Sequence, residues 1–103
     1  MTESDLLAEV LRLCEQYGLH SHHCYDSRKC AGSGVPDLLI CGTEVIHVEL
    51  KDDWGTLSPE QVAWKWSLVA AGARHLVWRP AQLHSGVIES TLVSIAPHYA
   101  KAA

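Results

Sequence analysis

The chain has 103 residues, of which 48% are hydrophobic and 19% are charged, and its formal net charge is −4. This composition predicts one globular domain and excludes a disordered chain. The net negative charge excludes a protein that is basic over its whole surface, but it is compatible with a local group of cations beside an acidic site. No apolar run approaches the roughly 18 residues of a membrane span, and the N-terminus lacks the order of a signal sequence, so we expect a cytoplasmic protein with no membrane partner.

An amphipathic helix is predicted over residues 4–17, because apolar residues recur there at three-and-four spacing. Ser4 can cap its start, and Gly18 supplies its stop. On a helical wheel Glu3 falls within about 40° of Val10, so it points along the buried stripe. Two interpretations of Glu3 stay open. It is either a carboxylate favoured by the positive end of the helix dipole or a member of a functional site.

Residues 19–25 are expected to form a strand, and residues 26–34 a polar loop. This stretch contains five residues of zinc-ligand type, which are His20, His22, His23, Cys24 and Cys30. They lack the paired C-x-x-C spacing of a strong zinc motif, so the alternatives are a polar strand and loop or a structural zinc site. We expect the four cysteines of an intracellular chain to be reduced.

A β-hairpin is predicted next, because two apolar runs meet at Gly42 and Thr43. The second run alternates between apolar and polar residues, so Glu49 and Lys51 project from one face. A three-residue turn would pair Cys41 with Val45 and place Asp37 directly opposite Glu49. A two-residue turn would make the two carboxylates near neighbours instead.

The closeness of Asp37 and Glu49 suggests a metal site. Two carboxylates about 4 Å apart repel by about 4 kcal/mol at an effective dielectric constant of about 20. A hard divalent cation with oxygen ligands would offset that repulsion. The alternative is that Asp37 ends a turn while Glu49 and Lys51 form a solvated strand face.

After the hairpin, residues 52–57 are expected to form a loop over the site, and a second helix follows. Ser58 as N-cap, Pro59 at the first position and Gln61 at the third have the order of a capping box. The apolar stripe of this helix consists of Val62, Trp66, Val69 and Ala70, and the helix ends at Gly72.

A short buried strand is predicted over residues 75–78 and is closed by Pro80. Residues 83–95 fit either a short helix or an extra strand. We expect the four tryptophans to belong to the core, although Trp54, in a glycine-containing loop, could stack on a base. Residues 100–103 are expected to be loose.

Four blocks of sequence carry a family resemblance. Pro36-Asp37 followed by Glu49-Leu50-Lys51 is the arrangement of PD-(D/E)xK nucleases. Together with Gly34-Val35 before it, Gly55-x-Leu57-Ser58-Pro59-Glu60-Gln61, and Ala71-Gly72-Ala73 before Val77-Trp78-Arg79-Pro80, this pattern resembles the small stand-alone VRR-NUC nucleases of phages and bacteria. The resemblance runs from Glu3 to about Pro80.

The resemblance implies an α/β fold with a restriction-endonuclease-like core, in which helices flank a mixed β-sheet in the approximate order α-β-β-β-α-β. We therefore expect a single VRR-NUC-like domain over residues 1–103, with its core at about 3–80 and a C-terminal extension at 81–103. A homodimer is also implied by the resemblance, since two active sites could cut two strands of a branched DNA.

The expected cofactor is Mg²⁺ or Mn²⁺, with Asp37, Glu49 and the backbone carbonyl of Leu50 as ligands. Lys51 would contact the attacking water or the phosphate, with a simple salt bridge to Glu49 as its alternative role. The resemblance implies that Glu3 holds a water or a second metal ion, and that Gln61 helps to position the attacking water. Capping of Ser58 is the alternative role for Gln61.

The expected DNA contacts are fewer than in a basic protein. Arg28 matches an Asp-Ser-Arg found in similar phage and actinobacterial proteins, whereas the commoner family form has an arginine directly before Gly-x-Pro-Asp, where this chain has Ser33. Ser58 begins a helix whose first amides could meet a phosphate. Lys29 and Lys65 complete the predicted contacts, and Lys51, Arg74 and Arg79 are further cations that could reach the site.

These features predict a divalent-metal-dependent deoxyribonuclease, an endonuclease that hydrolyses phosphodiester bonds, with a four-way (Holliday) junction or a flap as candidate substrates. A second hypothesis is a catalytically silent nucleic-acid or protein-binding module on a nuclease fold, which the acidic charge and Ser33 motivate. A third is a zinc-stabilised interaction domain. Intact Asp37, Glu49 and Lys51 favour the nuclease.

Overall fold

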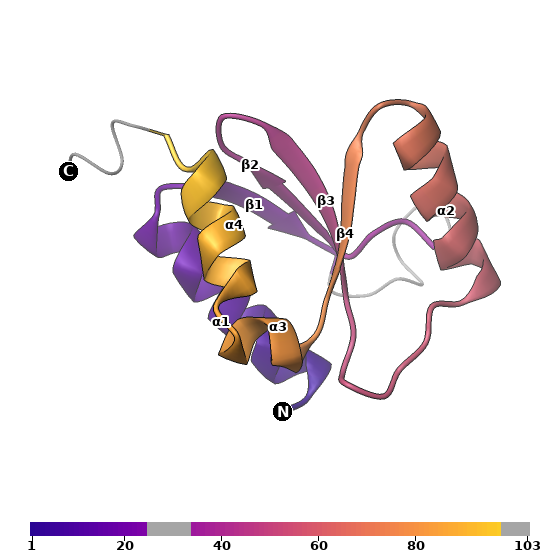
Figure 1. Cartoon of the computed structure of the whole chain (residues 1–103), viewed down its shortest axis with the longest axis horizontal. Helices are drawn as coiled ribbons and strands as arrows, with labels where there is room; N and C mark the ends of the chain where they lie inside the picture. Colours follow the sequence, from indigo (N-terminus) through magenta and orange to yellow (C-terminus); the bar gives the residue numbers. More distant parts are fainter. Residues whose placement is uncertain (25–33, 98–103) are drawn as a thin grey trace.

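The structure is a computed structural model that describes residues 1–24 and 34–97. Its elements, shown in Figure 1, are α1 (Glu3–Gln16), β1 (His20–His23), β2 (Leu38–Cys41), β3 (Val45–Leu50), α2 (Pro59–Ala70), β4 (Arg74–Trp78), α3 (Pro80–His84) and α4 (Val87–Ile95). The first six follow the predicted order α-β-β-β-α-β, which confirms the α/β fold class. The segment at 83–95, open between helix and strand, is helical.

The four strands form one mixed sheet in the order β1-β2-β3-β4. The first three are antiparallel neighbours, whereas β4 runs parallel to β3. Because a parallel neighbour requires a crossover, α2 connects these two strands. Figure 1 shows α1, α3 and α4 on one side of the sheet and α2 on the other.

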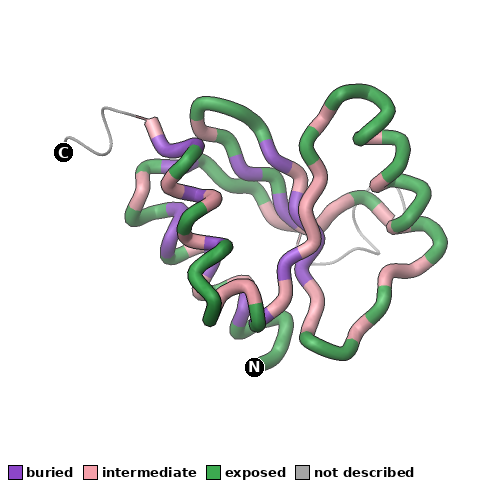
Figure 2. Tube along the Cα trace, viewed as in Figure 1, coloured by how far each residue is buried: buried purple, intermediate pink, exposed green. Residues whose placement is uncertain are grey.

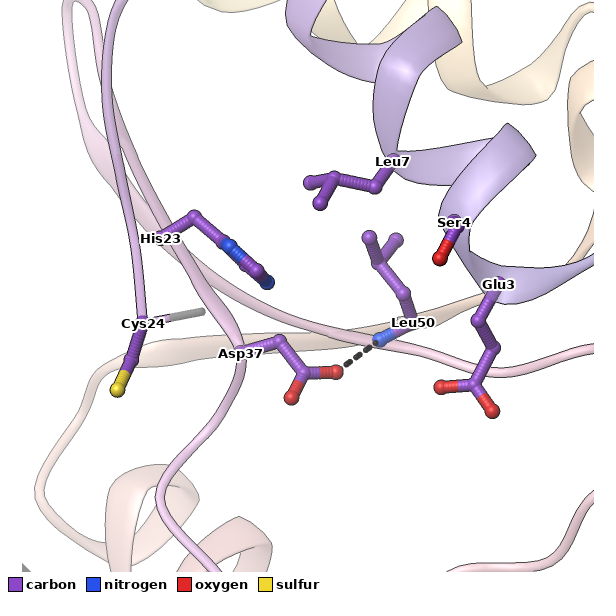
Figure 3. Close-up of a pocket in the computed structure, with 7 residues that line it drawn as sticks. All are labelled: Glu3, Ser4, Leu7, His23, Cys24, Asp37 and Leu50. Atoms are coloured by element: carbon purple, nitrogen blue, oxygen red, sulfur yellow. Dashed lines mark hydrogen bonds between the residues drawn. The ribbon is translucent and has the colours of Figure 1, made fainter. Parts of the chain in front are cut away.

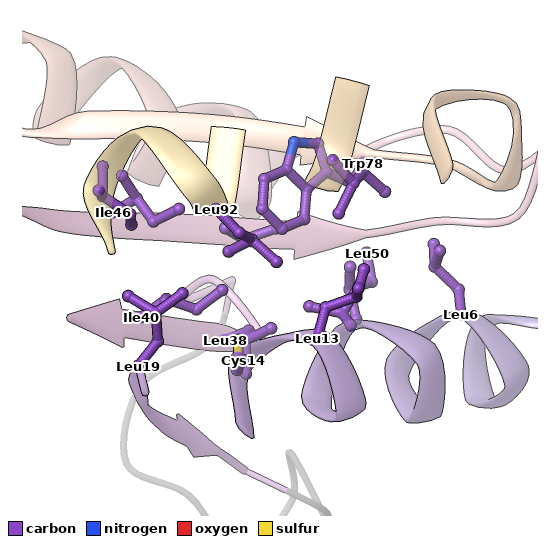
Figure 4. Close-up of a cluster of buried hydrophobic side chains, with 14 residues drawn as sticks. Leu6, Leu13, Cys14, Leu19, Leu38, Ile40, Ile46, Leu50, Trp78 and Leu92 are labelled. Atoms are coloured by element: carbon purple, nitrogen blue, oxygen red, sulfur yellow. The ribbon is translucent and has the colours of Figure 1, made fainter. Parts of the chain in front are cut away.

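The hydrophobic core lies between the sheet and the pair α1 and α4 (Figure 4). The alternating residues of β3 supply one wall of it, as the period-two pattern predicts. The fully buried side chains are chiefly Leu6 and Val10 of α1, Leu38 and Ile40 of β2, Ile46 and Val48 of β3, and Ile88 and Leu92 of α4. This packing fixes the face of the sheet that each strand residue occupies, including those that point away from the core.

The start of α1 differs from the prediction, because Thr2 rather than Ser4 is its N-cap. Thr2 Oγ1 accepts a hydrogen bond from the backbone N–H of Asp5, and the Asp5 carboxylate accepts one from Thr2 N–H. This capping box needs an acidic residue three positions after the cap, and the residue three positions after Ser4 is the apolar Leu7. The predicted stop is confirmed, since Gly18 has a left-handed φ of 69°.

The tryptophans and the apolar stripe of α2 were expected in the core, and this expectation is wrong for most of them. Of the four tryptophans, all of which the structure describes, Trp78 is buried, whereas Trp66 is 60% exposed. No residue of α2 is buried (Figure 2). Val62, Trp66 and Val69 of its stripe are exposed. The helix packs mainly along β4, and sequence periodicity does not show which elements a helix meets.

Parts of the predicted first strand and polar loop, and the terminal residues 100–103, lie outside the described residues. Within residues 1–24 and 34–97, no helix has both the length and the apolar character needed to cross a membrane.

Candidate active site

The register of β2 and β3 brings Asp37 and Glu49 together. Cys41 pairs with Val45 and Leu38 pairs with Val48, so the three-residue turn is confirmed and the two-residue turn is excluded. One step beyond the last pair, Asp37 lies opposite Glu49. The two carboxylates therefore meet at the end of the sheet where β3 leaves it.

Asp37 is held by the backbone of the opposing strand. The backbone N–H of Leu50 donates to Asp37 Oδ2 at 3.1 Å. This hydrogen bond uses Oδ2, so Oδ1 of Asp37 is the oxygen left for a ligand.

Gly34 lets the segment before Asp37 pass close to the start of α2. Its φ is +83°, and a Cβ added to it would lie 2.5 Å from the carbonyl carbon of Glu60. A side chain would therefore be strained there and would also collide with backbone. This explains the glycine of the Gly-Val-Pro-Asp block in physical terms.

Glu49 is 1% exposed and is the one charged side chain that is buried among the described residues. Gln61 Nε2 donates to its Oε1 at 3.0 Å, while its Oε2 is buried and has no hydrogen-bond partner within that part of the chain. The alternative of a solvated strand face is thus wrong for Glu49. A buried carboxylate oxygen without a donor requires a proton or a cation.

Burial raises the pKa of Glu49 to about 9, and the neighbouring Asp37 carboxyl adds to the rise. The positive charge of Lys51 lowers the pKa in part, and the negative charge of Glu3 raises it. The charges of Asp37, Lys51 and Glu3 are therefore close enough to act on Glu49, to which Gln61 also donates. At neutral pH Glu49 of the metal-free site therefore holds a proton.

Gln61 both caps α2 and reaches the carboxylate pair. Its Oε1 accepts from the backbone N–H of Ser58 at 2.8 Å, and its own N–H donates to Ser58 Oγ at 3.2 Å, which completes the predicted capping box. Its Nε2 then points to Glu49. An amide suits this place because it accepts at one end and donates at the other.

Beside the carboxylate pair lies a pocket of about 220 Å³, lined by Glu3, Ser4, Leu7, His23, Cys24, Asp37 and Leu50. Figure 3 shows the carboxylates of Glu3 and Asp37 extending toward the same open side of it, from α1 and from the start of β2. Glu3 is exposed rather than buried, so the prediction that it follows the buried stripe is wrong, although it does reach the site. Its place in the first turn makes the difference, because the core begins at Leu6.

His23 is a pocket residue that the sequence reasoning did not assign to the site. It pairs with Leu38 in the sheet and so lies on the opposite face from His22. The period-two rule applied to the predicted strand would have separated these two histidines.

Lys51 follows directly after β3 and is half-buried. A Cβ added to Gly55 would lie 3.5 Å from Lys51 Cδ, so the loop after β3 folds back over the lysine stem. This confirms the expected position of that loop beside the site.

The predicted DNA contacts fall into three groups. Arg28 and Lys29 lie outside the described residues. Ser58 begins α2 and its Oγ accepts from Gln61, while Lys65 lies with Nζ 5.2 Å from the centre of the Trp66 ring. Neither of these two lines the pocket.

Arg74 and Arg79 are engaged within the protein rather than directed at the site. Arg74 pairs with Glu44, and Arg79 donates to backbone carbonyls of the loop after β3. The positive surface near the site is therefore smaller than the count of basic residues indicates.

The zinc interpretation has little support. Cys14 and Cys41 are free, but Cys24 is disulfide-bonded, so the expectation of reduced cysteines is wrong for it and its sulfur is not a free thiolate ligand. That expectation rested on compartment, which local sequence does not encode. Cys30 is outside the described residues, and within those residues no three His, Cys, Asp or Glu side chains are grouped to hold a metal.

The carboxylate pair fits a magnesium-type ion better than zinc. Such ions are held by one or two carboxylates and keep several waters or phosphate oxygens, whereas structural zinc requires about four protein ligands. Two opposed carboxylates, an orphaned buried oxygen and an adjacent pocket meet the first requirement.

Comparison with known proteins supports the fold. No protein-family model and no curated protein matches the chain. A solved structure described as a VRR_NUC domain protein superposes with a TM-score of 0.59 and 21% sequence identity, covering 77% of this chain and 78% of the other. The chain has a VRR-NUC-like fold. At this identity the likeness extends to the VRR-NUC fold alone, so the chemistry is argued from the side chains.

Proposed function

We propose that the protein is a divalent-metal-dependent DNA endonuclease that hydrolyses phosphodiester bonds. The observation that carries this proposal is the buried Glu49 carboxylate, which lies opposite Asp37 with one oxygen that no described donor satisfies. A folded domain tolerates two such carboxylates when its function requires a cation between them.

The cation would be Mg²⁺ or Mn²⁺, held by Asp37, Glu49 and the backbone carbonyl of Leu50. When bound, it would supply a positive charge against a phosphate oxygen and would lower the pKa of a bound water. Glu3, across the pocket, would hold a water or a second ion through its exposed carboxylate.

The remaining side chains orient this site and complete its charge. Leu50 N–H fixes one oxygen of Asp37, and Gln61 fixes one oxygen of Glu49, so both carboxylates are aimed before any substrate binds. Lys51 brings a positive charge beside Glu49 and is placed to contact the scissile phosphate or the attacking water. Gln61 contributes to positioning that water from the first turn of α2.

DNA is the proposed partner, with branched forms such as four-way junctions or flaps as candidate substrates. A second proposal concerns assembly: we propose a homodimer that joins through the outward apolar stripe of α2, formed by Val62, Trp66 and Val69.

These three residues recur at four- and three-residue spacing on one exposed helix face, which suits contact with another protein surface. Sedimentation of the purified chain and of Val69→Glu tests this, and a monomeric wild-type protein would contradict it.

The nuclease proposal is tested by incubating labelled duplex, single-stranded, flap and junction DNA with the protein in Mg²⁺, Mn²⁺ or EDTA. Metal-dependent cutting would support it, and the preferred substrate would separate a junction-specific enzyme from a general one. Binding without cutting in any metal would instead favour a silent module.

A further inference from the structure

The loop that follows Lys51 is fixed by hydrogen bonds at several points. Asp52 Oδ1 accepts from Trp54 N–H at 2.9 Å and from Gly55 N–H. Arg79 Nη1 donates to the carbonyls of Asp52 at 2.7 Å and Gly55 at 2.6 Å. Asp53 Oδ1 accepts from Ala81 N–H at 3.1 Å, which ties the loop to the start of α3.

None of these contacts uses the indole of Trp54, which is 91% exposed. The side chain therefore contributes little to folding, because stabilisation by an aromatic ring requires that its surface be buried. Arg79 and two aspartates fix the backbone of this loop, and with it the point from which the ring projects. Such preorganisation lowers the entropic cost of binding something to it.

The surroundings of Trp54 indicate what it can bind. Its neighbours along the loop are Asp52, Asp53, Gly55 and Thr56, so no other large apolar residue is adjacent to it in sequence. The stripe on α2 is a continuous apolar face of the kind that meets protein, whereas a single ring offers a flat π-face. The two aspartates disfavour a phosphate but not an uncharged base.

An aromatic ring stacks on a base only when a face of that base is open, and bases within a duplex are covered on both faces. The loop also lies against the stem of Lys51, as the 3.5 Å approach of a Gly55 Cβ to Lys51 Cδ shows. Because Trp54 directly precedes Gly55, its ring projects from the part of the loop that lies beside Lys51.

We propose that Trp54 is a stacking platform for an unpaired base of the DNA substrate, next to the phosphate that the Asp37 and Glu49 site cleaves. This inference rests on the proposed function for the identity of the site. It assigns the chain a preference for DNA with single-stranded character beside the cut.

The test measures binding with Ca²⁺ in place of Mg²⁺, using a single-stranded oligonucleotide, a gapped duplex and a blunt duplex. Trp54→Ala should weaken binding of the first two by about 5- to 150-fold, the range measured for loss of one stacked base, and leave blunt-duplex binding unchanged. Trp54→Phe should retain most of the affinity. Trp64→Ala is the matched control, since it removes another exposed indole that lies outside the proposed dimer stripe, and it should not change the ratio between substrates.

Quenching of tryptophan fluorescence gives a second readout, and the part quenched by single-stranded DNA should disappear in Trp54→Phe. Equal weakening on all three DNAs, no weakening, or a change in oligomeric state of Trp54→Ala would overturn the inference. Parallel cleavage assays in Mg²⁺ separate the two proposals. If the protein cuts DNA only with metal but Trp54→Ala weakens no DNA selectively, only the stacking proposal is contradicted. If Trp54→Ala selectively weakens binding of single-stranded and gapped DNA but no DNA is cut, only the nuclease proposal is contradicted.

Discussion

Gln61 Nε2 lies 3.0 Å from Glu49 Oε1, so the first turn of α2 is tied to the buried carboxylate of β3. The same amide closes the capping box with Ser58. Gln61 thus both caps the helix and orients the candidate metal ligand Glu49. Helix stability and site geometry are therefore coupled through one side chain.

Two substitutions separate these roles of Gln61. Gln61→Ala should lower the free energy of unfolding by about 1–2 kcal/mol, because the cap loses its partner, and should reduce cleavage. Gln61→Glu keeps a side chain that can accept from Ser58 but sets a carboxylate beside Glu49. We expect it to retain the helix, measured by circular dichroism, and to lose cleavage. Full activity in Gln61→Glu would show that capping is the only role.

The stability of the metal-free protein should fall as pH rises. The pKa of Glu49 is about 9 in the folded chain against an ordinary value of 4.5, so the folded state binds the proton more tightly between these limits. The contribution of this proton to the free energy of unfolding is complete below the ordinary pKa and is lost as pH rises through the raised pKa. The free energy of unfolding should fall by at most about 1.4 kcal/mol per pH unit.

Urea unfolding in EDTA across this pH window measures the effect. Glu49→Gln keeps the shape of the side chain but cannot titrate, so its stability should change less with pH than that of the wild type. Parallel pH profiles for the two proteins would contradict the assignment of the proton to Glu49.

Binding of Mg²⁺ or Mn²⁺ should release a proton. Below the raised pKa of Glu49, the cation must displace the proton that this carboxyl holds, so apparent affinity should rise by up to about tenfold per pH unit. Titration calorimetry in buffers of different ionisation enthalpy counts the released protons. Glu49→Gln should remove this release, and pH-independent metal affinity in the wild type would contradict the prediction.

Gly34→Ala should be more destabilising than Gly72→Ala, although both glycines have nearly the same left-handed φ, +83° and +82°. The backbone strain of about 1–2 kcal/mol is common to both. At Gly34 the new Cβ would also collide with the backbone of Glu60, whereas at Gly72 the space is open. Chemical unfolding of the two variants gives the comparison, and equal losses would contradict the close approach.

Gly34→Ala should also reduce cleavage, because moving the segment before β2 displaces Asp37 from Leu50 N–H. Gly72→Ala, at the far end of α2, should cleave as the wild type does.

Local sequence was sufficient for the central pair of the site. Alternation in residues 45–51 indicated which side chains share a face, and both turns considered at Gly42 brought Asp37 and Glu49 together. The structure has the three-residue turn, which sets them opposite each other. The capping box at Ser58 was likewise readable, because caps depend on residues within one turn.

Burial was less predictable because it depends on how distant elements pack. The sequence places Glu49 on a polar strand face, but Gln61, twelve positions later, meets and covers it. The stripe of Val62, Trp66 and Val69 has the periodicity of a core helix and yet lies outside, since periodicity identifies an apolar face but not its partner. Thr2 rather than Ser4 is the N-cap because Asp5, three positions later, completes its capping box. This pattern could have been recognised in the sequence, since it lies within one helical turn.

The most direct test of the central claim compares wild type with Asp37→Asn, which keeps the acceptor for Leu50 N–H but removes the charge. Both proteins are incubated with labelled junction and single-stranded DNA in Mn²⁺ and in EDTA, and their thermal midpoints are measured without metal. We expect wild type to cut only with metal and Asp37→Asn to cut in neither condition, with a thermal midpoint close to that of wild type because the amide still accepts from Leu50 N–H. Undiminished cutting by Asp37→Asn, or cutting by wild type in EDTA, would contradict a metal site built on Asp37 and Glu49.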